Sequence, residues 1–151
     1  MTVLSNRITI AAARPAVWQT LTTLDLLDRY DPGVRSSQVV SEQATGLGAE
    51  RRCELRPAGW FVERVVAWQP EQVLAFELVT CSLPVARLRH DYTLTEQDGG
   101  TVVTQVMTYE LTHGPVGRLL DAVMMRRQWD RGVKGFLAGL KQTVEHQPAL
   151  G

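Results

Sequence analysis

Close to Gly114 the spacing of apolar residues changes from that of a series of strands to that of one long helix. Before that point, short runs in which apolar and polar residues alternate recur at intervals of roughly 8–12 residues, which is typical of an antiparallel meander. After it, apolar residues recur every three or four positions, as they do along one face of a helix. The chain therefore predicts an α+β fold in which most strands precede one long helix.

Turn residues divide the alternating part into strands. The strongest signal is Asp98-Gly99, which lies between two alternating runs and predicts a hairpin. Prolines and glycines at 46–48, 57–59 and 70 interrupt the alternation elsewhere. The predicted strands are 3–10, 36–42, 49–56, 60–68, 73–81, 87–95 and 101–111.

Two short helices are predicted between the first and second strands. Pro15 is typical of the first residue of a helix, and apolar residues follow it at helical spacing up to about Leu24. A second short helix is predicted at 25–30, where Asp25 can cap it, and the turn residues 31–33 end it.

The long helix is predicted to run from Gly114 to about His146. Thirty residues at 1.5 Å each span about 45 Å. A seven-stranded antiparallel sheet has one apolar face to cover, and this helix is the element long enough to cover it. Since a strongly twisted sheet wrapped around one helix does not fill its interior, we expect a cavity between the two. No linker divides the chain, so residues 1–151 are predicted to form a single domain.

Composition excludes several classes of protein. The 151 residues hold 16 Lys and Arg against 16 Asp and Glu, and this balance argues against a dedicated nucleic-acid binder. No stretch has the ~20 apolar residues of a membrane helix, and the N-terminus lacks the apolar core of a signal peptide. Cys53 and Cys81 match no metal motif, and two reduced thiols are typical of a cytoplasmic protein.

Four segments carry a family resemblance. Residues 10–18, with Pro15 and Val17-Trp18, resemble the opening of the START/Bet v 1-like superfamily, also called SRPBCC. Residues 46–51, 63–70 and 100–104 are similar to its bacterial polyketide cyclase/dehydrase-like branch. The resemblance implies a helix-grip fold with a hydrophobic cavity. It does not imply a catalytic motif, because members include lipid and hormone carriers, cyclases, dehydratases and oxygenase subunits.

Catalytic metals and cofactors are not expected. The histidines form no His-x-His or Glu-x-x-His motif, and the chain has no Cys-x-x-Cys pair and no phosphate-binding glycine loop. The oxygenase subunits of the superfamily need a metal and an additional iron–sulfur domain, for which this chain has neither ligands nor room. If the protein is an enzyme, we therefore expect a cofactor-independent one.

The strands on either side of the 57–59 turn place charges on the inner face. Counting outward from the turn puts Cys53 opposite Glu63 or close to it, and Arg51 diagonal to Glu63. A buried carboxylate must be paired or have a raised pKa. Two interpretations stay open: an ion pair that holds the sheet, or a charged group aimed at a ligand carbonyl. The residues predicted on this face are Arg51, Cys53, Leu55, Phe61, Glu63 and Val65.

The later strands add further inner-face candidates. His90 is predicted either to line the cavity or to be a satisfied edge histidine, and the tyrosines either to pack in the core or to contact a ligand. The parity of 73–81 is ambiguous, and Phe76 and Leu78 are placed inward. The candidates from these strands are Phe76, Leu78, His90, Tyr92, Gln105, Met107 and Tyr109.

Two charges interrupt the apolar stripe of the long helix. Arg127 and Asp130 stand where apolar residues are expected. They can pair with each other or extend outward, or Arg127 can face the cavity and bind an anionic or enolate oxygen. The stripe is otherwise Val116, Leu120, Val123, Val133, Leu137, Leu140 and Val144.

The sequence thus leaves two functions open. The first is a carrier or sensor that binds a hydrophobic or aromatic small molecule, either lipid-like or polyketide-like. The second is a polyketide cyclase or dehydratase, whose candidate acid–base residues are Glu63, His90, Tyr92, Tyr109 and Arg127. Candidate ligand contacts in either case are Arg51, Cys53, Leu55, Val65, Phe76, Leu78, Gln105, Met107, Leu120 and Val123. A monomer or weak homodimer is expected, because Trp129, Val133 and Phe136 are predicted to form a second apolar flank of the helix.

Overall fold

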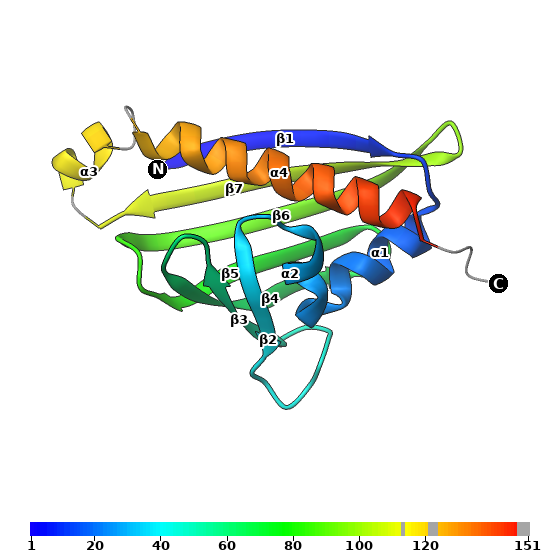
Figure 1. The fold of residues 1–151 in the computed structure, drawn as a ribbon, viewed down its shortest axis with the longest axis horizontal. Helices are drawn as coiled ribbons and strands as arrows, with labels where there is room; N and C mark the ends of the chain where they lie inside the picture. The colour runs from blue at the N-terminus through cyan, green and yellow to red at the C-terminus, as the bar shows by residue number, and fades with distance from the viewer. Residues whose placement is uncertain (113, 121–123, 148–151) are drawn as a thin grey trace.

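The computed structural model describes residues 1–112, 114–120 and 124–147 of the chain. Its core is a curved seven-stranded sheet with one long helix, α4, lying along it, and short helices near the C-terminal end of α4 (Figure 1). The predicted α+β helix-grip arrangement is therefore confirmed.

All strand pairs are antiparallel, in the order β1-β7-β6-β5-β4-β3-β2. Strands β2 to β7 form a meander, and β1 joins it at the edge of β7. The N-terminal strand thus ends up beside the last one, and α4 packs on both the sheet and α1. The strands are β1 Thr2–Ile10, β2 Val34–Val39, β3 Glu50–Leu55, β4 Trp60–Gln69, β5 Val73–Cys81, β6 Val85–Gln97 and β7 Gly100–Leu111.

The strand predictions agree with these bounds except at a few ends. The second strand begins and ends earlier than predicted, and β6 extends two residues further at each end. The two short helices lie where they were predicted. They are α1 Arg14–Thr22 and α2 Leu27–Tyr30, with the 3₁₀ turn η1 Leu24–Leu26 between them.

The prediction of one uninterrupted helix from 114 to 146 is wrong. The structure has two separate helices, α3 Gly114–Leu120 and α4 Arg126–Glu145, and α3 lies beyond the N-terminal end of α4 (Figure 1). Val116 and Leu119 are 64% and 67% exposed, so the apolar spacing of this segment does not reflect burial against the sheet. A helix of about 45 Å would also be longer than β7, whose 12 residues span about 40 Å.

One glycine of α4 sets how closely the helix approaches the short helices. A Cβ atom at Gly139 would clash with the backbone carbonyl of Tyr30 at the end of α2. At Gly132, by contrast, a Cβ atom would meet nothing within 4 Å. Gly139 therefore allows close backbone packing, whereas Gly132 has no packing role of this kind.

Candidate ligand-binding site

A cavity of about 480 Å³ lies between the sheet and the first half of α4. Its wall is built from the end of α2, the inner face of β3 to β7, and the turns between β3 and β4 and between β5 and β6. Residues 56–58 and Pro84 line it and are exposed, so the cavity reaches the surface at these turns.

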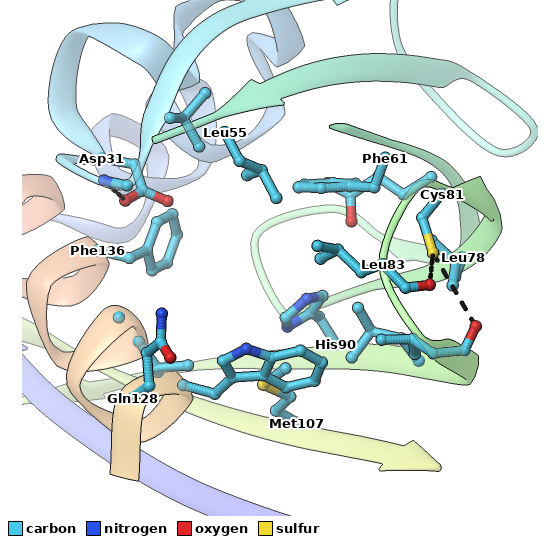
Figure 2. Close-up of a pocket in the computed structure, with 18 of the residues that line it drawn as sticks. Asp31, Leu55, Phe61, Leu78, Cys81, Leu83, His90, Met107, Gln128 and Phe136 are labelled. Atoms are coloured by element: carbon cyan, nitrogen blue, oxygen red, sulfur yellow. Dashed lines mark hydrogen bonds between the residues drawn. The ribbon is translucent and has the colours of Figure 1, made fainter. Parts of the chain in front are cut away.

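Most of the wall is apolar. Side chains from β3, β4, β5 and α4 face a common space, with His90 and Met107 along one side of it (Figure 2). Since apolar walls with a few polar groups are typical of small-molecule sites, this cavity is the candidate site of the protein. The large apolar residues lining it are Leu27, Val34, Leu55, Phe61, Leu78, Leu83, Val85, Leu88, Met107, Met125, Trp129, Val133 and Phe136.

A buried ion pair forms the charged part of the wall. Arg51 and Glu63 are directly opposite each other in the β3–β4 ladder, with 2.6 Å between Arg51 Nε and Glu63 Oε1 and both side chains 4% exposed. The guanidinium also donates to the Leu24 carbonyl and lies 4.4 Å from the ring centre of Phe76. Burial is the largest influence and opposes the charged form of Arg51, but Glu63 together with Cys53, Tyr30 and Tyr92 outweighs it, so the pKa of the guanidinium is raised.

A second polar group is the contact between His90 and Gln105. Gln105 Nε2 lies 2.7 Å from His90 Nδ1 across the β6–β7 pair. Burial lowers the pKa of His90 below 6.5, so the ring is neutral at pH 7. Tyr92 stacks beside the ring at 6.3 Å and packs edge-on against Phe76. Among the described residues, Gln105 Oε1 is the one buried side-chain oxygen or nitrogen without a hydrogen-bond partner.

Other titratable groups in or next to the cavity wall are held in uncharged or hydrogen-bonded states. Asp31 accepts a hydrogen bond from Gly33 N–H at 2.9 Å, and burial raises the pKa of its carboxyl. Burial also raises the pKa of the Cys53 thiol to about 12 and that of the Tyr92 hydroxyl well above 10. The Cys53 thiol is thus a poor nucleophile at neutral pH, since the thiolate is the reactive form.

Comparison with known proteins shows the family. A family model described as "Polyketide cyclase / dehydrase and lipid transport" matches residues 1–145. The chain belongs to this family. No curated protein matches the sequence. The predicted membership of the polyketide cyclase/dehydrase-like branch of SRPBCC is confirmed.

Solved structures show the same fold. TTHA0849 from Thermus thermophilus has a TM-score of 0.82 and 22% identity, over 95% of this chain and 97% of that one. Ara h 8.0201 has a TM-score of 0.77 and 10% identity, over 97% of this chain and 99% of that one. The Zhui aromatase/cyclase from Streptomyces sp. R1128 has a TM-score of 0.75 and 16% identity, over 99% of this chain and 98% of that one. At these identities the likeness shows the fold.

Apart from Arg127, the predicted site residues separate into three groups. Those that line the cavity are Arg51, Leu55, Glu63, Leu78, His90, Tyr92, Gln105 and Met107. Those buried in the core but not part of the cavity wall are Cys53, Val65, Phe76 and Tyr109. The Leu120 side chain and Val123 lie outside what the structure describes.

The register prediction around the 57–59 turn needs one correction. Cys53 is opposite Phe61, and Arg51 is directly opposite Glu63 rather than diagonal to it. The reason is the length of the turn. Leu55 N–H bonds to the Gly59 carbonyl, which closes the hairpin two residues tighter than pairing of Cys53 with Glu63 would require.

Of the interpretations of Arg127, the structure supports the outward one. Arg127 is exposed and does not line the cavity, whereas Trp129 does. Within α4, Trp129 lies four residues before the buried Val133 and shares its face, whereas Arg127 lies six residues before it and does not. Asp130 pairs with Lys134 and accepts a bond from Asn6, both at 2.8 Å, instead of pairing with Arg127.

The second apolar flank predicted for the helix does not exist. Val133 and Phe136 are 7% and 6% exposed and, with Trp129, face the cavity. These three residues follow one another at intervals of four and three positions, so they share one face of α4, and that face is the inner one.

Sequence reasoning also missed Asp31 and the 83–84 turn. Both were interpreted as turn residues, and their position beside the cavity depends on how distant strands pair. Among the described residues, no group of three or more His, Cys, Asp or Glu side chains could hold a metal ion. No described helix has the length and apolar content needed to cross a membrane.

Proposed function

We propose that the protein binds a hydrophobic or aromatic small molecule, lipid-like or polyketide-like, in the cavity between the sheet and α4. The observation that carries the proposal is a cavity of about 480 Å³ with a mostly apolar wall. Small-molecule pockets typically enclose about 300–1,000 Å³. The inner face of the sheet contributes polar groups from β3, β4, β6 and β7, so a bound molecule would turn a polar end toward the sheet.

Burial of apolar surface supplies the affinity in this proposal. Each Å² of apolar surface removed from water contributes about 25 cal/mol. Leu55, Phe61, Met107, Trp129 and Phe136 surround the space from four elements, so a flat ring would contact apolar atoms on both faces. The family description, which includes lipid transport, supports the same class of ligand.

The first experiment identifies the ligand. The protein is purified from its own host under mild conditions and measured by native mass spectrometry. A bound molecule of low polarity is the expected result, and a protein that carries nothing after gentle purification contradicts a tight carrier.

The second experiment tests the cavity. The neutral fluorophore N-phenyl-1-naphthylamine should bind to the wild-type protein and gain fluorescence. Leu88→Trp places a larger ring in the cavity wall and should abolish this binding. Val79→Trp is the matched control, because Val79 lies on β5, is 43% exposed and does not line the cavity. Equal binding by both variants would place the fluorophore elsewhere.

Catalysis as a cyclase or dehydratase is the second candidate function. It is favoured by Glu63, His90 and Tyr92, three candidate acid–base residues that line one cavity. Such chemistry moves a proton next to a carbonyl group. We therefore expect a catalytic protein to exchange the α-protons of 2-tetralone for deuterium in D₂O, followed by NMR, and His90→Phe to abolish the exchange. No exchange above buffer would leave binding as the function.

The remaining expectations concern partners and place in the cell. The protein is proposed to act as a cytoplasmic monomer or weak homodimer that does not bind nucleic acid. Its balanced charge supports the last point. Light scattering at micromolar concentration should give the mass of one chain or a concentration-dependent average, and a stable higher oligomer would contradict this.

A further inference from the structure

The charges that line the cavity are already balanced within the protein. The described lining residues include Asp31, Glu63, Arg51 and Arg56, two of each sign. Arg56 is exposed on the β3–β4 turn, where water solvates it. Arg51 has Glu63 at 2.6 Å and the Leu24 carbonyl as partners and lies over the Phe76 ring. The inner part of the cavity therefore holds no cation that lacks a counter-charge among the described residues.

A carboxylate in this space would meet an unfavourable environment. It would have to compete with Glu63 for Arg51, and success would leave Glu63 buried without its partner. Asp31 lines the same space and adds a second acidic group. An uncharged ligand avoids both costs.

Two side chains of the inner wall, His90 and Tyr92, have polar atoms that remain available to a ligand, and His90 is the one whose hydrogen-bonding role is fixed by a neighbour. Gln105 Nε2 is an amide nitrogen, which donates, so His90 Nδ1 accepts from it. A neutral imidazole that accepts at Nδ1 carries its proton on Nε2. His90 Nε2 has no hydrogen-bond partner in the described part of the chain, yet it is not among the buried unpartnered atoms there. It is therefore accessible from the cavity that His90 lines.

We infer that the cavity selects ligands whose polar end is an uncharged oxygen, such as that of a phenol, alcohol or ketone, and that His90 Nε2–H donates the hydrogen bond that holds it. This inference rests on the proposed function and adds to it the chemical class of the ligand's polar end. A fatty acid or another carboxylate with the same apolar body is selected against.

Three probes with the same ring system test the inference. They are 2-methylnaphthalene, 2-naphthol and 2-naphthoate, each measured near neutral pH by displacement of N-phenyl-1-naphthylamine. We expect 2-naphthol to displace the fluorophore at a concentration about tenfold lower than either of the others. Equal or tighter binding of 2-naphthoate overturns the inference.

Two variants test the role of His90. His90→Phe should weaken 2-naphthol binding about tenfold, to the level of 2-methylnaphthalene, and leave 2-methylnaphthalene unchanged. His146→Phe is the matched control, since His146 is exposed at the end of α4. An unchanged preference for 2-naphthol in His90→Phe overturns the assignment of His90 as donor.

A change at Glu63 tests the charge balance. Glu63→Gln frees Arg51, so 2-naphthoate should now bind more tightly than 2-naphthol. If that variant does not fold, Asp31→Asn removes the other lining carboxylate from the surface end of α2 and should strengthen 2-naphthoate binding by a smaller factor. No gain in 2-naphthoate binding by the folded variant overturns the argument from charge.

The outcomes separate this inference from the proposed function. If neither the fluorophore nor any of the three probes binds, both the proposed function and the inference fail. If 2-methylnaphthalene binds as well as 2-naphthol, the proposed function stands and the inference fails. ¹⁵N NMR of the labelled protein gives an independent test, because the inference requires a protonated Nε2 and an unprotonated Nδ1 on His90, and the opposite tautomer overturns it.

Discussion

The β3–β4 ladder carries two ion pairs side by side, one on each face of the sheet. Arg51–Glu63 points inward and Glu50–Arg64 points outward, and in both the residues are directly opposite each other with the closest atoms 2.6 Å apart. The inner side chains are each 4% exposed, whereas Arg64 is 50% and Glu50 23% exposed. The two pairs share chemistry and spacing, so the comparison isolates the effect of burial.

Burial changes what each pair contributes. The outer pair is solvated with or without its partner, so it contributes about 0–1 kcal/mol. The inner pair adds little stability compared with well-packed apolar residues in its place. Removing one of its two charges is nevertheless costly, because the other charge then stays buried without a partner. The inner pair therefore makes the wall of the cavity sensitive to any change in charge, while the outer pair does not constrain the site.

The largest expected effect comes from breaking each pair in turn. Glu63→Gln should lower the free energy of unfolding by about 3–5 kcal/mol, because Arg51 stays buried without a counter-charge. Glu50→Gln should lower it by about 0–1 kcal/mol. Urea denaturation of both variants measures the difference, and equal losses would show that burial does not distinguish the two faces.

A similar contrast between packed and open positions exists along α4. Gly139→Ala should destabilise the protein by about 1–3 kcal/mol, since its Cβ atom would meet the Tyr30 carbonyl. Gly132→Ala should stabilise it by up to about 1 kcal/mol, because it gains helix propensity and meets nothing within 4 Å. Thermal melts of the two variants should shift in opposite directions. A stabilised Gly139→Ala would mean that α4 does not pack on α2 as described.

The inner face also predicts how stability depends on pH. Burial lowers the pKa of His90 below its unfolded value of 6.5, so between the two values the unfolded chain binds more protons. The contribution of His90 is therefore fully present above pH 6.5 and decreases as the pH falls, by at most about 1.4 kcal/mol per pH unit. His90→Phe should remove this slope and His146→Phe should keep it.

Asp31 does not obscure that measurement. The raised pKa of Asp31 changes stability with pH in the opposite direction. In the pH range that begins at 3.8 the folded state binds more protons than the unfolded chain, so stability rises as the pH falls. The difference between wild type and His90→Phe cancels the Asp31 contribution. Identical pH slopes for the two proteins would contradict the burial of a neutral His90.

The smallest expected effect is the response of the outer pair to salt. The few tenths of a kcal/mol that Glu50 contributes should disappear in about 1 M salt, where charges are screened within about 3 Å. The loss caused by Glu63→Gln should persist under the same conditions, since buried charges are screened much less. Urea denaturation of both variants at low and high salt tests this, and a salt-sensitive inner pair would contradict its burial.

Strand parity explains why this ladder could be predicted from sequence. Alternation places Arg51 and Glu63 on one face and Glu50 and Arg64 on the other without any knowledge of the fold. The hairpin at 98–99 and the short helices follow from local turn and capping chemistry in the same way. The cavity was expected from the twist of a sheet wrapped around one helix and from the family resemblance, because no local pattern reveals it.

The parts of the candidate site that the sequence did not predict depend on contacts between distant parts of the chain. The face that Arg127 presents depends on which side of α4 packs on the sheet, and apolar spacing alone left it between an inward and an outward position. Asp31 becomes part of the site because the end of α2 packs beside the cavity, and a turn motif alone cannot show this. Trp129 was assigned to a second flank of the helix because the same spacing does not show which face is the inner one.

The central claim is that an uncharged apolar molecule binds between the sheet and α4, and the methionine methyl groups test it most directly. The chain has 4 methionines. Met107 and Met125 line the cavity, while Met1 and Met124 are 77% and 63% exposed. With ¹³C-methyl-labelled protein and 2-naphthol, the account predicts NOEs from the ring protons to the Met107 and Met125 methyl groups and none to Met1 or Met124. NOEs confined to Met1 or Met124 would contradict it.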